Sequence, residues 1–158
     1  MEAVVYAVAG LALLAYIISR QVGERRRTRR SLVLLPAGFL VLALTVDHTA
    51  AHRLAHPLAV AMLVAGVLVA AGFGVVRATT MVVRRDGDTL VTKGTRRTLV
   101  LWLLTIAVRV GMAVLAYALG APEGAAEGLL FAAATIGAQN LVLARRGGLL
   151  RTAVPAFQ

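Results

Sequence analysis

The stretch that decides the fold is residues 98–119, TLVLWLLTIAVRVGMAVLAYAL, in which Arg109 is the one charged residue. About 20 mostly apolar residues in a helix cross the hydrocarbon core of a bilayer. The stretch therefore predicts a transmembrane helix. Arg97 and Gly120 mark its ends, so at ~1.5 Å per residue Arg109 lies ~17 Å from either end, near the bilayer centre.

Four further apolar runs extend this interpretation to the whole chain, at residues 3–19, 31–46, 58–76 and 128–144. The chain is 59% hydrophobic, with a mean hydropathy of +0.83. A soluble domain of 158 residues could not bury that much apolar surface. We predict an all-α membrane protein, a single polytopic domain over residues 1–158 with about five transmembrane helices.

Basic residues predict the orientation of these helices. Two expected basic loops between apolar runs, residues 20–30 and 77–97, each hold six of the 17 Lys and Arg residues, and the tail 145–151 holds three. A five-helix path places all three groups on one side, which the positive-inside rule makes the cytoplasm. The N-terminus is then outside and the C-terminus cytoplasmic. The net charge of +10 is explained by this distribution, so we expect contact with membrane lipids and no nucleic-acid partner.

A different pattern separates the third and fourth apolar runs. Asp86-Gly87-Asp88 stands between two short runs rich in β-branched residues, within residues 81–94. Asp-Gly in this setting favours a two-residue hairpin turn, because glycine tolerates positive φ. We predict a short cytoplasmic β-hairpin at residues 81–94, with an ordinary solvated loop as the alternative.

Small residues recur every four positions in the third apolar run, at Gly66, Ala70 and Gly74. Such a stripe lets two helices approach closely in a membrane. We interpret it as a packing surface rather than a ligand site.

Arg109 is the first candidate for function. A charge at the bilayer centre costs at least ~2.5–3.5 kcal/mol and arginine cannot shed its proton, so the side chain must face the bundle interior. By helical spacing Trp102 shares its face. Three polar residues of the last apolar run lie at a depth from which they can accept its hydrogen bonds, namely Thr135, Gln139 and Asn140. We predict that these five residues bind a ligand, or alternatively that the polar residues only satisfy the arginine.

No carboxylate is expected beside Arg109. Asp47 and Glu127 fall near the outer surface by depth, and Glu123 is expected with Glu127 in a solvated outer loop. A central arginine without a counter-charge favours an anionic ligand, a water-filled cavity or a carboxylate from a partner subunit.

Histidines at positions 48, 52 and 56 form the second candidate site. On a helix, residues four apart share one ridge and can place two imidazoles on one metal. The metalloprotease motif is missing, however, and a three-histidine ridge does not converge on one point. We favour a water-exposed helix end, so no cofactor is evident, with haem or a divalent metal on His48, His52 and His56 as the alternative. With no cysteine, thiolate metal sites and disulfides are excluded.

Several of these features together resemble the CcdC-like family of small bacterial integral membrane proteins. The resemblance rests on residues 72–80 (GFGVVRATT), the Asp86-Gly87 turn, Lys93-Gly94, Leu101-Trp102 and Arg109. It implies a protein of the bacterial cytoplasmic (inner) membrane with a helix-bound Arg109 and a cytoplasmic hairpin. It supplies no catalytic mechanism.

Three classes of function follow from these residues. We expect first a non-catalytic accessory or ligand-binding subunit that holds an anionic or lipid-like ligand, or a partner helix, against Arg109. The alternatives are a small transporter or channel, as one chain or as a homo-oligomer, and an intramembrane enzyme acting on a lipid or isoprenoid substrate. In the enzyme, Arg109 would stabilise negative charge, while Glu127, Gln139 or a histidine would serve for proton transfer or orientation. The sequence leaves open whether the protein is catalytic.

Overall fold

A computed structural model describes residues 25–46, 55–87, 89–121 and 123–149. The predicted helix at residues 3–19 lies outside these residues, as do Asp47, His48 and His52. The described chain forms four helices, α2 (Arg29–Val46), α4 (Pro57–Thr79), α5 (Arg96–Ala118) and α6 (Ala125–Arg146). Three strands accompany them, β1 (Arg25–Thr28), β2 (Val82–Asp86) and β3 (Thr89–Lys93).

The helices coincide with four of the five predicted segments to within one turn at each end. In the described residues, α4, α5 and α6 are long and apolar enough to span a membrane, and α2 is a shorter apolar helix. Many large apolar side chains on these helices are exposed, including Leu68, Val100, Val114 and Leu44. This pattern suits a protein whose outer surface contacts lipid. Three apolar helices of this length are compatible with an integral membrane protein.

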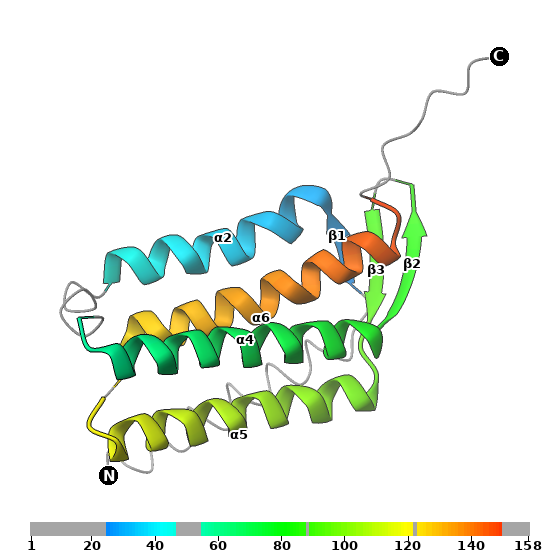
Figure 1. The fold of residues 1–158 in the computed structure, drawn as a ribbon. Coiled ribbons are helices and arrows are strands. Elements are labelled where there is room, and N and C mark those ends of the chain that lie inside the picture. The colour runs from blue at the N-terminus through cyan, green and yellow to red at the C-terminus, as the bar shows by residue number, and fades with distance from the viewer. Residues whose placement is uncertain (1–24, 47–54, 88, 122, 150–158) are drawn as a thin grey trace, which may run out of the picture.

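Helix α6 occupies the centre of the bundle, where it packs extensively against both α2 and α4 (Figure 1). Helix α5 packs against α4. All four helices have one end beside the three-stranded sheet, because α2 and α5 begin there and α4 and α6 end there (Figure 1). The described basic loops therefore meet at one end of the bundle.

Glycine at position 74 sets the distance between α4 and α6. A Cβ atom there would lie 2.2 Å from the backbone oxygen of Thr135 and 3.1 Å from the Cβ of Ala138. No side chain fits in that space. Gly66, Ala70 and Gly74 are all buried on α4, so the predicted small-residue stripe is a packing surface.

A proline determines how α2 meets α6. Pro36 has no backbone N–H, so the carbonyl of Leu32, four residues earlier, has no intrahelical donor. The Asn140 side chain on α6 supplies one, with its Nδ2 donating to the Leu32 oxygen at 2.7 Å. The Oδ1 of Asn140 accepts from Arg27 Nη1 at 2.9 Å. Asn140, which is 3% exposed, thus joins α2, β1 and α6.

The sheet has the strand order β1-β3-β2, with both pairs antiparallel. Strands β2 and β3 fall within residues 81–94, for which the sequence predicts a hairpin, and Gly87 in the turn has φ +58°. Its cytoplasmic placement stays a prediction. Strand β1 is a correction, because residues 25–30 were expected to be a basic loop. It forms because the second edge of β3 is free to pair, and because Leu90 of β3 packs with Leu32 and Ala144 in a buried cluster.

Candidate functional site

A cavity of about 310 Å³ lies between α4, α5 and α6 and carries one arginine toward each end. Its lining is mostly apolar, and Phe39 of α2 contributes to it. Ligand sites in proteins are typically mostly apolar cavities of ~300–1,000 Å³ with a few well-placed polar groups. The residues that line it are Phe39, Arg77, Trp102, Thr105, Ile106, Arg109, Val110, Gly128, Phe131, Ala132, Thr135 and Ile136.

Arg77 is the most deeply buried of the described charges, with 1% of its surface exposed. It lies in the last turn of α4, where the helix dipole favours a cation. Its Nε donates to Gln139 Oε1 at 2.6 Å, and its Nη2 donates to Thr135 Oγ1 at 3.3 Å. Its guanidinium lies over the Trp102 ring, 5.6 Å from the centroid. Each of these partners is neutral.

The Gln139 amide is held at its other end as well. Its Nε2 donates to the sulfur of Met81 at 3.5 Å. This contact orients Oε1 toward Arg77. Arg77 therefore sits in a preformed set of acceptors rather than on a flexible side chain.

A second cation lies close to Arg77. Arg27 donates to Asn140, the residue after Gln139, and the two guanidinium groups are near enough to repel each other. Within the described residues, no carboxylate forms an ion pair with Arg77. A buried cation costs several kcal/mol when only neutral groups surround it. The surroundings of Arg77 therefore favour an anion.

Arg109 differs from the sequence-based expectation. It forms an ion pair with Glu123, and the two side chains are 21% and 10% exposed. Its guanidinium lies 5.6 Å from the Phe131 ring centroid. The prediction that Arg109 has no carboxylate partner is therefore wrong, and so is the prediction that Glu123 is solvated. The long arginine side chain reaches past its own depth on α5, and the connection after α5 folds back to meet it.

The polar residues predicted around Arg109 instead serve other arginines. Trp102, Thr135 and Gln139 contact Arg77, while Asn140 bonds Arg27 and α2. Trp102, Thr135 and Arg109 do line one cavity. Gln139 and Asn140 are not among the residues that line this cavity, and Asn140 instead lines a separate one between α2 and α6.

Arg77 was missed because it directly follows an apolar run and was grouped with the basic loop. One signal in the sequence points to it. It lies three residues after Gly74, so it continues the stripe of small residues that faces α6. A cation on a packing stripe is expected to be buried.

Two other predicted positions have structural surroundings. Glu127 is a further correction, because it was predicted in a solvated loop but is buried in the first turn of α6. It accepts a hydrogen bond from the Gly124 N–H at 2.8 Å, which caps the helix. His56 is exposed just before α4. Among the described residues no group of three or more metal-ligating side chains is close enough to hold a metal. His48 and His52 lie outside that part of the chain, so a metal or haem on the histidines stays the alternative to a water-exposed helix end.

No family model, curated protein or solved structure matches this chain. The resemblance to the CcdC-like family therefore stays a prediction, and the site is interpreted from its own geometry.

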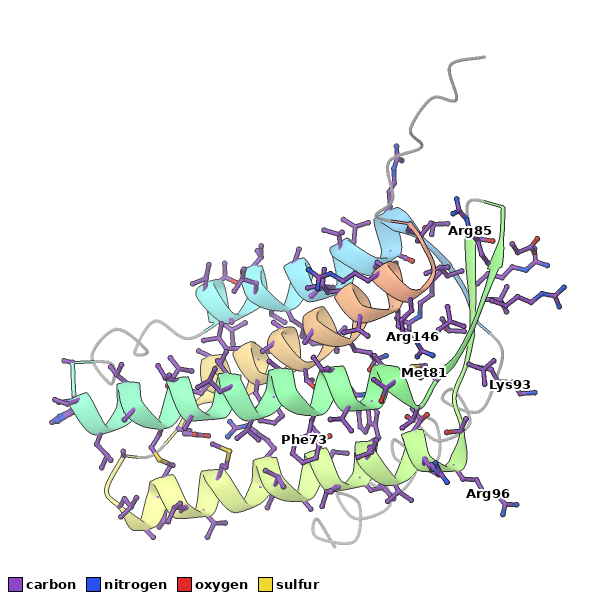
Figure 2. The ribbon with its side chains drawn as sticks, turned by 45° about the vertical axis from the view of Figure 1, so that its right-hand side comes forward. Phe73, Met81, Arg85, Lys93, Arg96 and Arg146 are labelled. Carbon is purple, nitrogen blue, oxygen red and sulfur yellow. The ribbon has the colours of Figure 1, made fainter. Side chains whose placement is uncertain are left out.

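The end of the bundle nearest Arg77 is strongly basic. Arg85, Lys93, Arg96 and Arg146 lie there around the sheet (Figure 2). Arg146 donates to the backbone oxygens of Ala78 and Met81 at the end of α4. Within the described residues, Asp86 is the carboxylate of this end, and it pairs with Arg26 at 3.8 Å. The local potential thus adds to the attraction of an anion toward Arg77.

Proposed function

We propose that this chain is a membrane-embedded binding protein that holds an anionic amphiphile in the cavity between α4, α5 and α6, with Arg77 binding the anionic group. One observation carries this proposal. Arg77 is 1% exposed and, within the described residues, is surrounded by neutral acceptors. Two of its five N–H groups make these hydrogen bonds. The remaining donors suit a phosphate or carboxylate, which arginine binds in bidentate fashion.

The walls of the cavity indicate the rest of the ligand. Phe39, Ile106, Phe131 and Ile136 present apolar surface beyond Arg77. Such walls favour an alkyl or isoprenoid chain, since burying apolar surface is worth ~25 cal/mol per Å². An amphiphile with a single apolar chain satisfies both ends of the site.

The proposal includes a location. Apart from Arg109, the described arginines gather at the sheet end of the bundle, which supports a cytoplasmic sheet and a bacterial cytoplasmic (inner) membrane. Arg77 would then lie near the inner leaflet, whose anionic lipids are one source of the ligand. The protein would act as an accessory subunit beside a membrane protein partner or a second copy of itself.

Native mass spectrometry of the full chain from mild detergent tests the proposal. Wild-type protein is expected to retain an anionic amphiphile, and Arg77→Gln to lose it. Arg96→Gln is the matched control, because it removes an exposed cation at the same end. Equal retention by Arg77→Gln and Arg96→Gln would contradict the proposal.

A second function is favoured by one observation, the presence of arginines toward both ends of the same cavity. Two cation positions along one path suit stepwise movement of an anion, as in a small transporter. Flux of decanoate into proteoliposomes would distinguish transport from binding. A rate equal to that of empty liposomes would end this alternative.

A further inference from the structure

The end of the cavity opposite Arg77 is also organised around a guanidinium. Arg109 lies over Phe131 and faces Gly128, where an added Cβ would be 3.6 Å from its Nη2. Gly128 is in the first turn of α6, whose backbone N–H groups attract anions. Arg109 thus supplies a cation beside a helix N-terminus, within the cavity.

Glu123 fills this position in the structure, but it is held differently from Arg109. Arg109 is fixed within α5, whereas Glu123 lies between the end of α5 at Ala118 and the start of α6 at Ala125. Gly120, with φ +76°, and Gly124 lie in the same connection. The Glu123 carboxylate can therefore leave Arg109 without breaking a helix. A free carboxylate or phosphate offers Arg109 the same oxygen atoms.

The distance between the two guanidinium groups follows from their contacts with α6. Thr135, which bonds Arg77, and Gly128, which faces the Nη2 of Arg109, are seven residues apart. At ~1.5 Å per residue this spacing gives ~10 Å between the two anion positions.

We propose that Arg109 is a second anion position of the same cavity, which Glu123 occupies and which an anionic group of the ligand takes over. The ligand class is then an amphiphile with anionic groups ~10 Å apart, one at Arg77 and one at Arg109. This inference rests on the proposed function for the Arg77 end. When the ligand binds, the Glu123 carboxylate leaves Arg109 and becomes hydrated at the end of the cavity opposite Arg77, and no covalent bond changes.

Calorimetric titration of the full chain in detergent, with decanoate and decanedioate as probes, tests this assignment. Glu123→Gln removes the competing charge, so it is expected to bind decanedioate ~10-fold more tightly than wild type does, as for one charge-assisted hydrogen bond. Decanoate affinity should change less than ~2-fold, because its one carboxylate binds at Arg77. Asp86→Asn, which removes an exposed carboxylate from the sheet end, should change neither affinity.

Two further variants separate this inference from the proposed function. Adding Arg109→Gln to Glu123→Gln should abolish the gain in decanedioate affinity. An unchanged decanedioate affinity in Glu123→Gln would overturn the second anion position and leave the Arg77 site intact. A decanoate affinity unchanged by Arg77→Gln would overturn the proposed function instead. Even then, a gain in decanedioate affinity in Glu123→Gln that Arg109→Gln reverses would establish Arg109 as an anion position.

Discussion

Replacing Gly74 by alanine should separate α4 from α6 at the level of the Arg77 site. The new Cβ would stand 2.2 Å from the Thr135 backbone oxygen, against ~3.3 Å for a normal C···O contact. Because that oxygen belongs to a helix backbone, α4 must move by ~1 Å. The same movement stretches the hydrogen bonds from Arg77 to Gln139 and Thr135.

The expected cost combines three effects. Overpacking in a core costs ~1–3 kcal/mol. The two hydrogen bonds to the charged group contribute ~1.5–3 kcal/mol each, and stretching them without breaking them costs ~2 kcal/mol in total. The higher helix propensity of alanine returns ~1 kcal/mol. We therefore expect Gly74→Ala to lower the free energy of unfolding by about 2–4 kcal/mol. Gly72→Ala is the matched control on the same helix, because nothing lies within 4 Å of its added Cβ, and its effect should stay within ~1 kcal/mol.

Unfolding by sodium dodecyl sulfate in mixed micelles gives both values. Trp102 is the single tryptophan and lies beneath Arg77, so its fluorescence reports directly on this region. Circular dichroism provides an independent signal for the helices. Equal transition midpoints for Gly74→Ala and Gly72→Ala would refute the close contact between α4 and α6.

Two other predictions concern the helix α2 junction and the orientation of the chain. Asn140→Leu should lower the free energy of unfolding by ~2–4 kcal/mol, because it leaves the Leu32 carbonyl without a donor and removes the hydrogen bond to Arg27 of β1. In a Pro36→Ala background the Leu32 carbonyl regains a helical donor, so the loss should be smaller by ~1 kcal/mol. An identical loss in both backgrounds would exclude the link to proline. Because the chain has no cysteine, Thr89→Cys and Ala121→Cys can be labelled without background, and impermeant maleimide added to intact cells should label only Ala121→Cys. The opposite pattern would reverse the orientation.

The helices were predictable because their signal is local. A backbone in hydrocarbon must satisfy its own hydrogen bonds, so a long apolar run predicts a helix almost regardless of its neighbours. Residues 58–76 and 98–119 accordingly match α4 and α5 closely. Strand β1 was not predictable in this way, since the four residues Arg25–Thr28 have little strand signal of their own and pair only because β3 offers an edge.

The site was predictable only in part, because its partners are set by packing between helices. Depth estimates correctly singled out Thr135 and Gln139 as polar groups within the bundle, yet assigned them to Arg109. The close approach at Gly74 brings Arg77 to them first. Depth also placed Glu123 in water, since it ignores how far an arginine side chain extends toward a helix end.

The most direct test of the central claim, that Arg77 binds the anion of a ligand, is ligand-dependent stability. A ligand at 100 times its Kd stabilises the folded protein by ~2.7 kcal/mol. Delipidated wild-type protein should gain about that much with decanoate, while Arg77→Met, which replaces the buried charge by an apolar side chain of similar length, should gain none. An equal gain in wild type and Arg77→Met would show that the anion binds elsewhere.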